Sequence, residues 1–169
     1  DGYCRGRGAA ARLRRELSAL SLSCNKLAAR WEGVPGMTGA VRWLLDNCYI
    51  ARREGLDAAA TLDGAGRLPS REGVPIILLL CGGFVRCSHL QADEGRLALF
   101  LEGWQSVSPL SRRELELLGA GLRAGLIAEL ASLARKLCSV AADAVPESTM
   151  KSIFTSLREL SSADLTELT

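Results

Sequence analysis

The sequence predicts an all-α fold of about six or seven helices, arranged as a helical bundle or as packed αα-hairpins. Leucines and other apolar residues recur at helical spacing through most of the chain. Glycines and prolines separate these segments, and no stretch shows the alternation of apolar and polar residues typical of a half-buried strand. The length of 169 residues and the apolar content of 48% fit a single folded domain, residues 1–169.

Two helices are expected in the first third of the chain. The first spans about residues 9–31, and its buried side carries the apolar residues Leu13, Leu17, Leu20, Cys24 and Leu27. The second spans about residues 38–54, and a polar loop is expected at residues 63–73. Pro75 then lies in the first turn of a third helix. A backbone N–H has no intrahelical acceptor there, so the N–H that proline lacks is not needed.

Capping signals predict where helices begin in the second half of the chain. Asp93 is expected to cap a helix over residues 94–105. Ser111 followed three residues later by Glu114 is a capping box, and we expect the longest helix of the chain to begin there. That helix carries a leucine stripe, and the glycines within it, Gly121 and Gly125, permit close approach of a neighbouring helix. The stripe consists of Leu115, Leu118, Leu122, Leu126, Leu130, Leu133 and Leu137.

A last helix is expected over about residues 146–160, and residues 161–169 then begin a linker or a truncated further helix. The sequence opens without an initiator methionine and stops inside a helical pattern, so we expect a fragment of a much larger multidomain protein. The longest apolar run, VPIILLLCGGF, has about half of the roughly 20 residues that a membrane span needs, which favours a buried core element.

Charge and cysteine usage narrow the class of protein. The formal net charge is +2, and the one cluster of arginines near the start is short and has no aromatic residues between its members, so nucleic acid is not indicated as a partner. The six cysteines are scattered without a C-x-x-C pair, which is typical of reduced, buried thiols in a cytoplasmic protein. The arginines are Arg5, Arg7, Arg12, Arg14 and Arg15.

No complete catalytic or metal-binding signature is present in the sequence. Cys81, Cys87 and His89 supply three candidate ligands, but their spacing matches no common zinc pattern. The glycine-rich stretches lack the strand and the Lys-Ser/Thr pair that identify a phosphate-binding loop. We therefore expect no catalytic residue, metal or cofactor in this chain.

The stretch WLLDNCYIARR, residues 43–53, is the strongest candidate site, because it places Asp46 and Asn47 among large apolar side chains. A helical wheel distributes apolar residues around most of this helix, so both polar side chains are expected to be buried and hydrogen-bonded. Two interpretations stay open. The pair holds neighbouring helices together, or it forms with Trp43 and Tyr49 a polar cleft that takes a sugar ring.

Three stretches in order resemble the cyclic β-1,2-glucan synthases, which are very large bacterial enzymes. WLLDNCYIARR is similar to the family's Trp-Leu-Leu-Asp-Asn motif. Residues 108–137 resemble a Thr-Pro-Leu-Thr stretch that leads into a long helix, and residues 155–168 resemble a Ser-Leu-Arg segment that closes the same region. The resemblance covers about residues 40–169 and points to the helical region near the family's N-terminus.

This resemblance mainly implies a function for the larger protein of which this chain would be a part, which we call the parent. The parent would be an enzyme of the inner membrane that uses UDP-glucose and a divalent metal to build β-1,2-glucan. This chain would be a non-catalytic helical domain that serves as a scaffold or holds glucan, with other domains of the same polypeptide as its partners. No catalytic position is carried over. The alternative is a stand-alone carbohydrate-binding or interaction domain with its cleft near Asp46 and Asn47.

Overall fold

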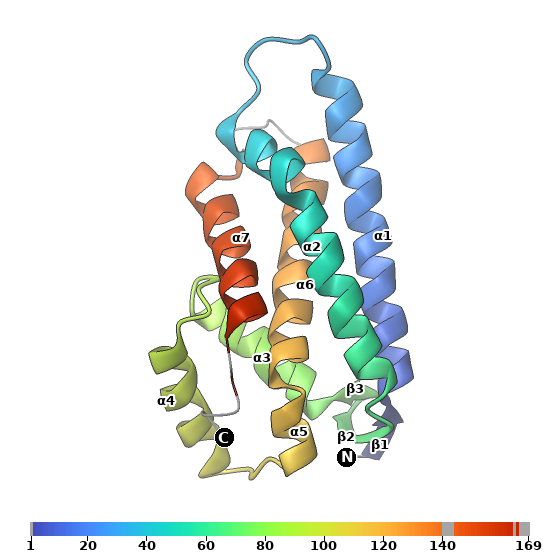
Figure 1. Cartoon of the computed structure of the whole chain (residues 1–169), viewed down its shortest axis with the longest axis vertical. Helices are drawn as coiled ribbons and strands as arrows, with labels where there is room; N and C mark the ends of the chain where they lie inside the picture. Colours follow the sequence, from blue (N-terminus) through green and yellow to red (C-terminus); the bar gives the residue numbers. More distant parts are fainter. Residues whose placement is uncertain (1, 140–143, 164, 166–169) are drawn as a thin grey trace.

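The computed structural model describes residues 2–139, 144–163 and 165, and it confirms an essentially all-α fold with seven helices among these residues (Figure 1). A small three-stranded sheet accompanies the helices at one end of the molecule. In chain order the elements are β1 (Gly2–Arg5), α1 (Gly6–Trp31), α2 (Gly39–Asp63), β2 (Arg67–Arg71), β3 (Val74–Pro75), α3 (Ile76–Cys87), α4 (Glu94–Gln105), α5 (Arg112–Glu116), α6 (Leu118–Ser139) and α7 (Glu147–Ser162).

Helix α6 is the centre of the bundle. Helices α1, α2, α6 and α7 run along the long axis of the molecule, and α6 contacts α1, α2, α3 and α7 (Figure 1). The predicted leucine stripe explains this position, because most of its members are completely buried. Each buried leucine side chain contributes roughly 1.5–3 kcal/mol through the hydrophobic effect. The fully buried members are Leu118, Leu122, Leu126, Leu130 and Leu137.

Helix α3 approaches α6 closely at its two glycines, as the sequence predicted. A Cβ atom added at Gly121 would lie 2.6 Å from the sulfur of Cys81, and one added at Gly125 would lie 3.2 Å from a methyl carbon of Val85. Both neighbours belong to α3. The absence of side chains at these two glycines therefore permits the close approach of α3 to α6.

Helices α1 and α2 are longer than predicted. Helix α1 begins at Gly6 instead of residue 9, where the Gly6 N–H donates to the carbonyl oxygen of Gly66 at 2.7 Å. Helix α2 continues to Asp63 instead of residue 54, because its buried face continues through Ala58, Ala59 and Leu62. Two long antiparallel helices thus form one side of the bundle (Figure 1).

The sheet contradicts the predictions that the chain has no strand and that residues 63–73 form only a loop. Strand β2 lies between β1 and β3 and is antiparallel to both. Glu72 and Gly73 connect β2 to β3 with φ angles of 52° and 77°, as in the two-residue type I′ hairpin turn. The sequence does not predict these strands because they are very short, because β2 contains a proline, Pro69, and because β1 pairs with a distant segment.

The capping box at Ser111 is confirmed, but the helix that it starts is short. The Ser111 hydroxyl accepts from the Glu114 N–H at 3.3 Å, and the Glu114 carboxylate accepts from the Ser111 N–H at 2.9 Å. Helix α5 ends at Glu116, and Leu117, with ψ near 1°, separates it from α6. The prediction of the longest helix here is therefore wrong, since α6 has 22 residues and α1 has 26.

The remaining helices begin close to where the sequence placed them. The Asp93 carboxylate accepts from the Arg96 N–H at 3.0 Å and caps α4, which buries only Leu97 and Leu101 completely. Helix α7 includes Ser161 and Ser162, and most of the expected linker or truncated helix at 161–169 lies outside the described residues.

Candidate functional site

The four residues predicted as a site on α2 lie in two different environments. Trp43 and Asn47, one helical turn apart, contact α7. Asp46 and Tyr49 are exposed, and the side chain of Tyr49 retains 59% of its accessible surface. The structure therefore does not combine the four into one cleft.

Asn47 is buried, with 9% exposure, and both ends of its amide are hydrogen-bonded. The nitrogen donates to the carbonyl oxygen of Trp43 at 2.9 Å, and the oxygen accepts from the guanidinium of Arg158 at 2.9 Å. Because Arg158 belongs to α7, this amide joins the middle of α2 to a neighbouring helix. The expectation that Asn47 is buried and hydrogen-bonded is confirmed.

Trp43 makes a second connection between α2 and α7. The indole N–H donates to the carboxylate of Glu147 at 3.1 Å, and the ammonium of Lys151 lies 5.8 Å from the centroid of the ring. The Glu147 carboxylate occupies the space that a Cβ at Gly39 would need, so the glycine at the start of α2 admits this contact. The indole N–H and the ring of Trp43 thus both contact residues of α7, Glu147 and Lys151.

The prediction that Asp46 is buried is wrong. The helical wheel shows the neighbours of Asp46 on its own helix, but it does not show which faces other helices cover. Helix α7 covers the side that carries Trp43 and Asn47, whereas Asp46 lies on a side that faces solvent. An ionised carboxylate keeps its hydration there and needs no protein partner.

The six cysteines are free thiols and only two of them are buried. Burial, with a smaller contribution from the neighbouring Cys48 and Cys138, raises the pKa of the Cys24 thiol to about 12. Burial also raises the pKa of Cys81, whose sulfur lies 3.7 Å from the carbonyl oxygen of Leu118. The expectation of buried thiols holds for Cys24 and Cys81 and is wrong for Cys87, which is exposed.

The candidate metal ligands are not brought together. Cys81 packs against α6, whereas Cys87 and His89 are exposed at the end of α3. In the described part of the chain, no three or more His, Cys, Asp or Glu side chains are arranged to hold a metal ion. Across the same residues, no helix is both long enough and apolar enough to cross a membrane.

An ion cluster that contains the buried Glu54, and that the sequence did not suggest, connects α2, α6 and α7. Glu54 is almost completely buried, and its carboxylate lies 3.3 Å from the guanidinium of Arg123 on α6. The same guanidinium lies 3.0 Å from the carboxylate of Asp57 and donates to the carbonyl oxygen of Leu160 at 3.2 Å. One arginine of α6 thus contacts both α2 and α7.

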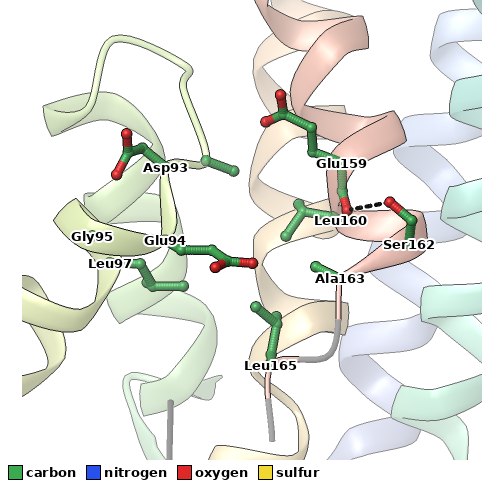
Figure 2. Close-up of a pocket in the computed structure, with 10 residues that line it drawn as sticks. Asp93, Glu94, Gly95, Leu97, Glu159, Leu160, Ser162, Ala163 and Leu165 are labelled. Carbon is green, nitrogen blue, oxygen red and sulfur yellow. Dashed lines mark hydrogen bonds between the residues drawn. The ribbon is translucent and has the colours of Figure 1, made fainter. Parts of the chain in front are cut away.

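A polar cavity of about 530 Å³ separates the start of α4 from the end of α7 (Figure 2). It is lined by three acidic residues, Asp93, Glu94 and Glu159, and the side chain of Glu94 extends across it toward α7. Ser162 donates to the carbonyl oxygen of Glu159 at 3.2 Å on the far wall. The volume suits a small ligand, and carboxylates accept hydrogen bonds from hydroxyl groups.

An apolar groove of about 510 Å³ lies between α1 and α2 on the side away from the core. Leu22 and Leu56 are exposed in it, at 56% and 47%, although each lies on a long and well-packed helix. We call this surface the outer groove. It is lined by Arg14, Leu17, Ser18, Ser21, Leu22, Asn25, Arg52 and Leu56.

Comparison with known proteins adds no relative, since no protein-family model, no curated protein and no solved structure matches this sequence significantly.

Proposed function

We propose that this chain is a non-catalytic helical domain of a cyclic β-1,2-glucan synthase-like glucosyltransferase, where it serves as a scaffold for other domains of the same polypeptide. The parent would be anchored in the inner membrane, would keep this domain in the cytoplasm, and would build β-1,2-glucan from UDP-glucose with a divalent metal. The observation that carries the scaffold role is the amide of Asn47, whose hydrogen bonds are used between α2 and α7.

The three stretches that resemble the glucan synthases support this proposal by their positions. They correspond to the middle of α2, to α5 with most of α6, and to the second half of α7. Helices α2, α6 and α7 all contact one another. The resemblance therefore lies on helices that pack against one another in the bundle.

The outer groove supports a role in contacting another domain. Leu22 and Leu56 project from α1 and α2 into a surface that the described residues leave open. Domain interfaces within one polypeptide typically bury such apolar patches. A neighbouring domain seated on this groove would remove both leucines from water.

The coding sequence on either side of this region provides the first test. We expect it to encode membrane spans and a glucosyltransferase domain in the same reading frame. An open reading frame without them would overturn the assignment to a glucan synthase, whatever the chain itself binds.

Calorimetric titration with β-1,2-glucan distinguishes the scaffold from a glucan-holding domain. A scaffold is expected to give no saturable heat up to millimolar glucan. Saturable binding would reject the scaffold role, and loss of that binding in a Glu94→Gln/Glu159→Gln variant would place the glucan in the cavity of Figure 2. The matched variant is Glu102→Gln/Glu116→Gln, which removes two exposed carboxylates elsewhere.

Side-chain footprinting with hydroxyl radicals tests the contact with another domain. In the complete polypeptide, we expect Leu22 and Leu56 to be modified much less than in the isolated domain. Leu99 on α4 is the internal control, because its side chain is 71% exposed and lies outside the outer groove. Equal modification of the groove leucines in both samples would argue against a domain seated there.

A further inference from the structure

The outward face of the small sheet carries an unusual pair of positive charges. In the register of β1 and β2, Arg5 lies directly opposite Arg67. Residues directly opposite in an antiparallel pair point to the same side, and Arg5 and Arg67 are both exposed, whereas Leu68 between the strands and the bundle is buried. Two like charges in this arrangement destabilise a strand pair.

A third guanidinium approaches from α5. A Cβ atom at Gly66 would lie 2.9 Å from a terminal nitrogen of Arg113, so this side chain lies against the residue that precedes Arg67. The carbonyl oxygen of Gly66 also accepts from the Gly6 N–H, which directly follows Arg5. Arg113 therefore lies beside Gly66, and Gly66 in turn contacts Gly6, so the neighbours of Arg5 and Arg67 in the sequence are close to α5 at the end of the bundle that carries the sheet (Figure 1).

We call Arg5, Arg67 and Arg113 the arginine cluster. No ion pair joins any of the three to another residue in the described part of the chain, whereas nearby arginines outside the cluster are paired, Arg14 with Asp63 and Arg112 with Glu116. The ring of Tyr3 lies 5.5 Å from the guanidinium carbon of Arg67. This stacking favours one orientation of the Arg67 guanidinium and leaves its charge without an anionic partner.

We propose that the arginine cluster binds a phosphate group, supplied by a soluble diphosphate or by a phospholipid headgroup. Each guanidinium offers a planar pair of N–H donors that matches two phosphate oxygens. A phosphate between Arg5 and Arg67 would replace their mutual repulsion with attraction to a shared anion. This inference concerns a different surface from the outer groove and does not depend on the proposed glucan synthase assignment.

Thermal unfolding in inorganic pyrophosphate tests the soluble source. At equal ionic strength, pyrophosphate is expected to raise the Tm of the wild-type chain above its value in sodium chloride, with saturation as the site fills. The Arg5→Ser/Arg67→Ser variant is expected to lose this shift, which corresponds to binding weakened at least about tenfold. The matched variant Lys26→Ser/Arg42→Ser removes the same charge from exposed positions of α1 and α2 and is expected to keep it.

Sedimentation with vesicles tests the lipid source. Wild type and the Lys26→Ser/Arg42→Ser variant are expected to bind vesicles of phosphatidylcholine with phosphatidylglycerol, and not vesicles of phosphatidylcholine alone. The Arg5→Ser/Arg67→Ser variant, shown to be folded by circular dichroism, is expected to stay in solution. A response to either probe that depends on the cluster supports the proposal. No response to both, or an equal loss in the two double variants, would overturn it.

Discussion

Asn47 and Asp46 are adjacent in sequence but differ completely in environment. The amide of Asn47 lies between Trp43 and Arg158, whereas Asp46 faces solvent. Substitution Asn47→Ala should lower the free energy of unfolding by about 1–3 kcal/mol, because it removes a buried amide that accepts a hydrogen bond from the charged guanidinium of Arg158 on α7. Chemical denaturation monitored by circular dichroism measures this loss.

The neighbouring substitution Asp46→Ala is the control for that experiment. It removes an exposed carboxylate, and its effect on the free energy of unfolding should stay within about 0.5 kcal/mol. If Asp46→Ala instead destabilised the fold as much as Asn47→Ala, the assignment of only Asn47 to the helix contact would be wrong.

Cys24 should make the stability of the fold sensitive to alkaline pH. Its pKa is raised from 9.0 to about 12 in the folded chain, mainly by burial, so the unfolded chain releases this proton at lower pH. The stabilisation is complete below about pH 9 and decreases as pH rises toward 12. In Cys24→Ala, the free energy of unfolding measured between pH 8 and pH 11 should decline less steeply than in wild type. Parallel curves for the two proteins would contradict the raised pKa.

At the level of elements, the contact of α3 with α6 depends on Gly121. An alanine there would place a methyl group 2.6 Å from the sulfur of Cys81. Although alanine favours a helix by about 1 kcal/mol over glycine, crowding in a packed core costs roughly 1–3 kcal/mol. Gly121→Ala should therefore lower the Tm, as measured by differential scanning calorimetry.

Gly83→Ala provides the matched comparison, because Gly83 also lies within a helix, α3, and has open space where the Cβ would be. The gain in helix propensity should dominate, and the Tm should rise. The same sign of change in both variants would mean that close approach does not decide the outcome at Gly121.

Local signals in the sequence predict the helices better than they predict the contacts between them. Asp93 and Ser111 accept hydrogen bonds from backbone N–H groups three residues later, so a few neighbouring residues are enough to predict these helix caps. The leucine stripe of α6 likewise repeats at a fixed spacing. Strand β1 lacks such a signal, because it pairs with residues 67–70, far away in the sequence.

The candidate site shows the same limit. The sequence identified Asn47 as a polar group that needs a partner and Trp43 as its neighbour in a possible cleft. The partners of these two side chains on α7, Arg158 and Glu147, lie on a helix much later in the chain. Nothing near Asp46 indicates that its side of α2 remains uncovered. The buried position of Glu54 was missed for a similar reason, since its partner Arg123 is on α6.

For the molecule as a whole, the bundle is joined by a few polar contacts within an apolar core. Arg123 alone reaches two carboxylates of α2 and the last turns of α7. Among the described residues, removal of this guanidinium leaves the buried carboxylate of Glu54 with only the exposed Arg53, at 3.2 Å, as a cationic partner. A buried charge left with a poor partner is strongly destabilising.

Arg123→Met is therefore expected to lower the free energy of unfolding by about 3 kcal/mol, the lower end of the range for a broken buried pair, because Arg53 compensates in part. The double variant Glu54→Leu/Arg123→Met should be considerably more stable than Arg123→Met, since it leaves no buried carboxylate. Arg112→Met, which breaks the exposed pair with Glu116, should change stability by less than about 1 kcal/mol. Urea denaturation of the four proteins measures these differences. A double variant no more stable than Arg123→Met would show that the loss comes from packing, and that the charge of Glu54 is not what Arg123 compensates.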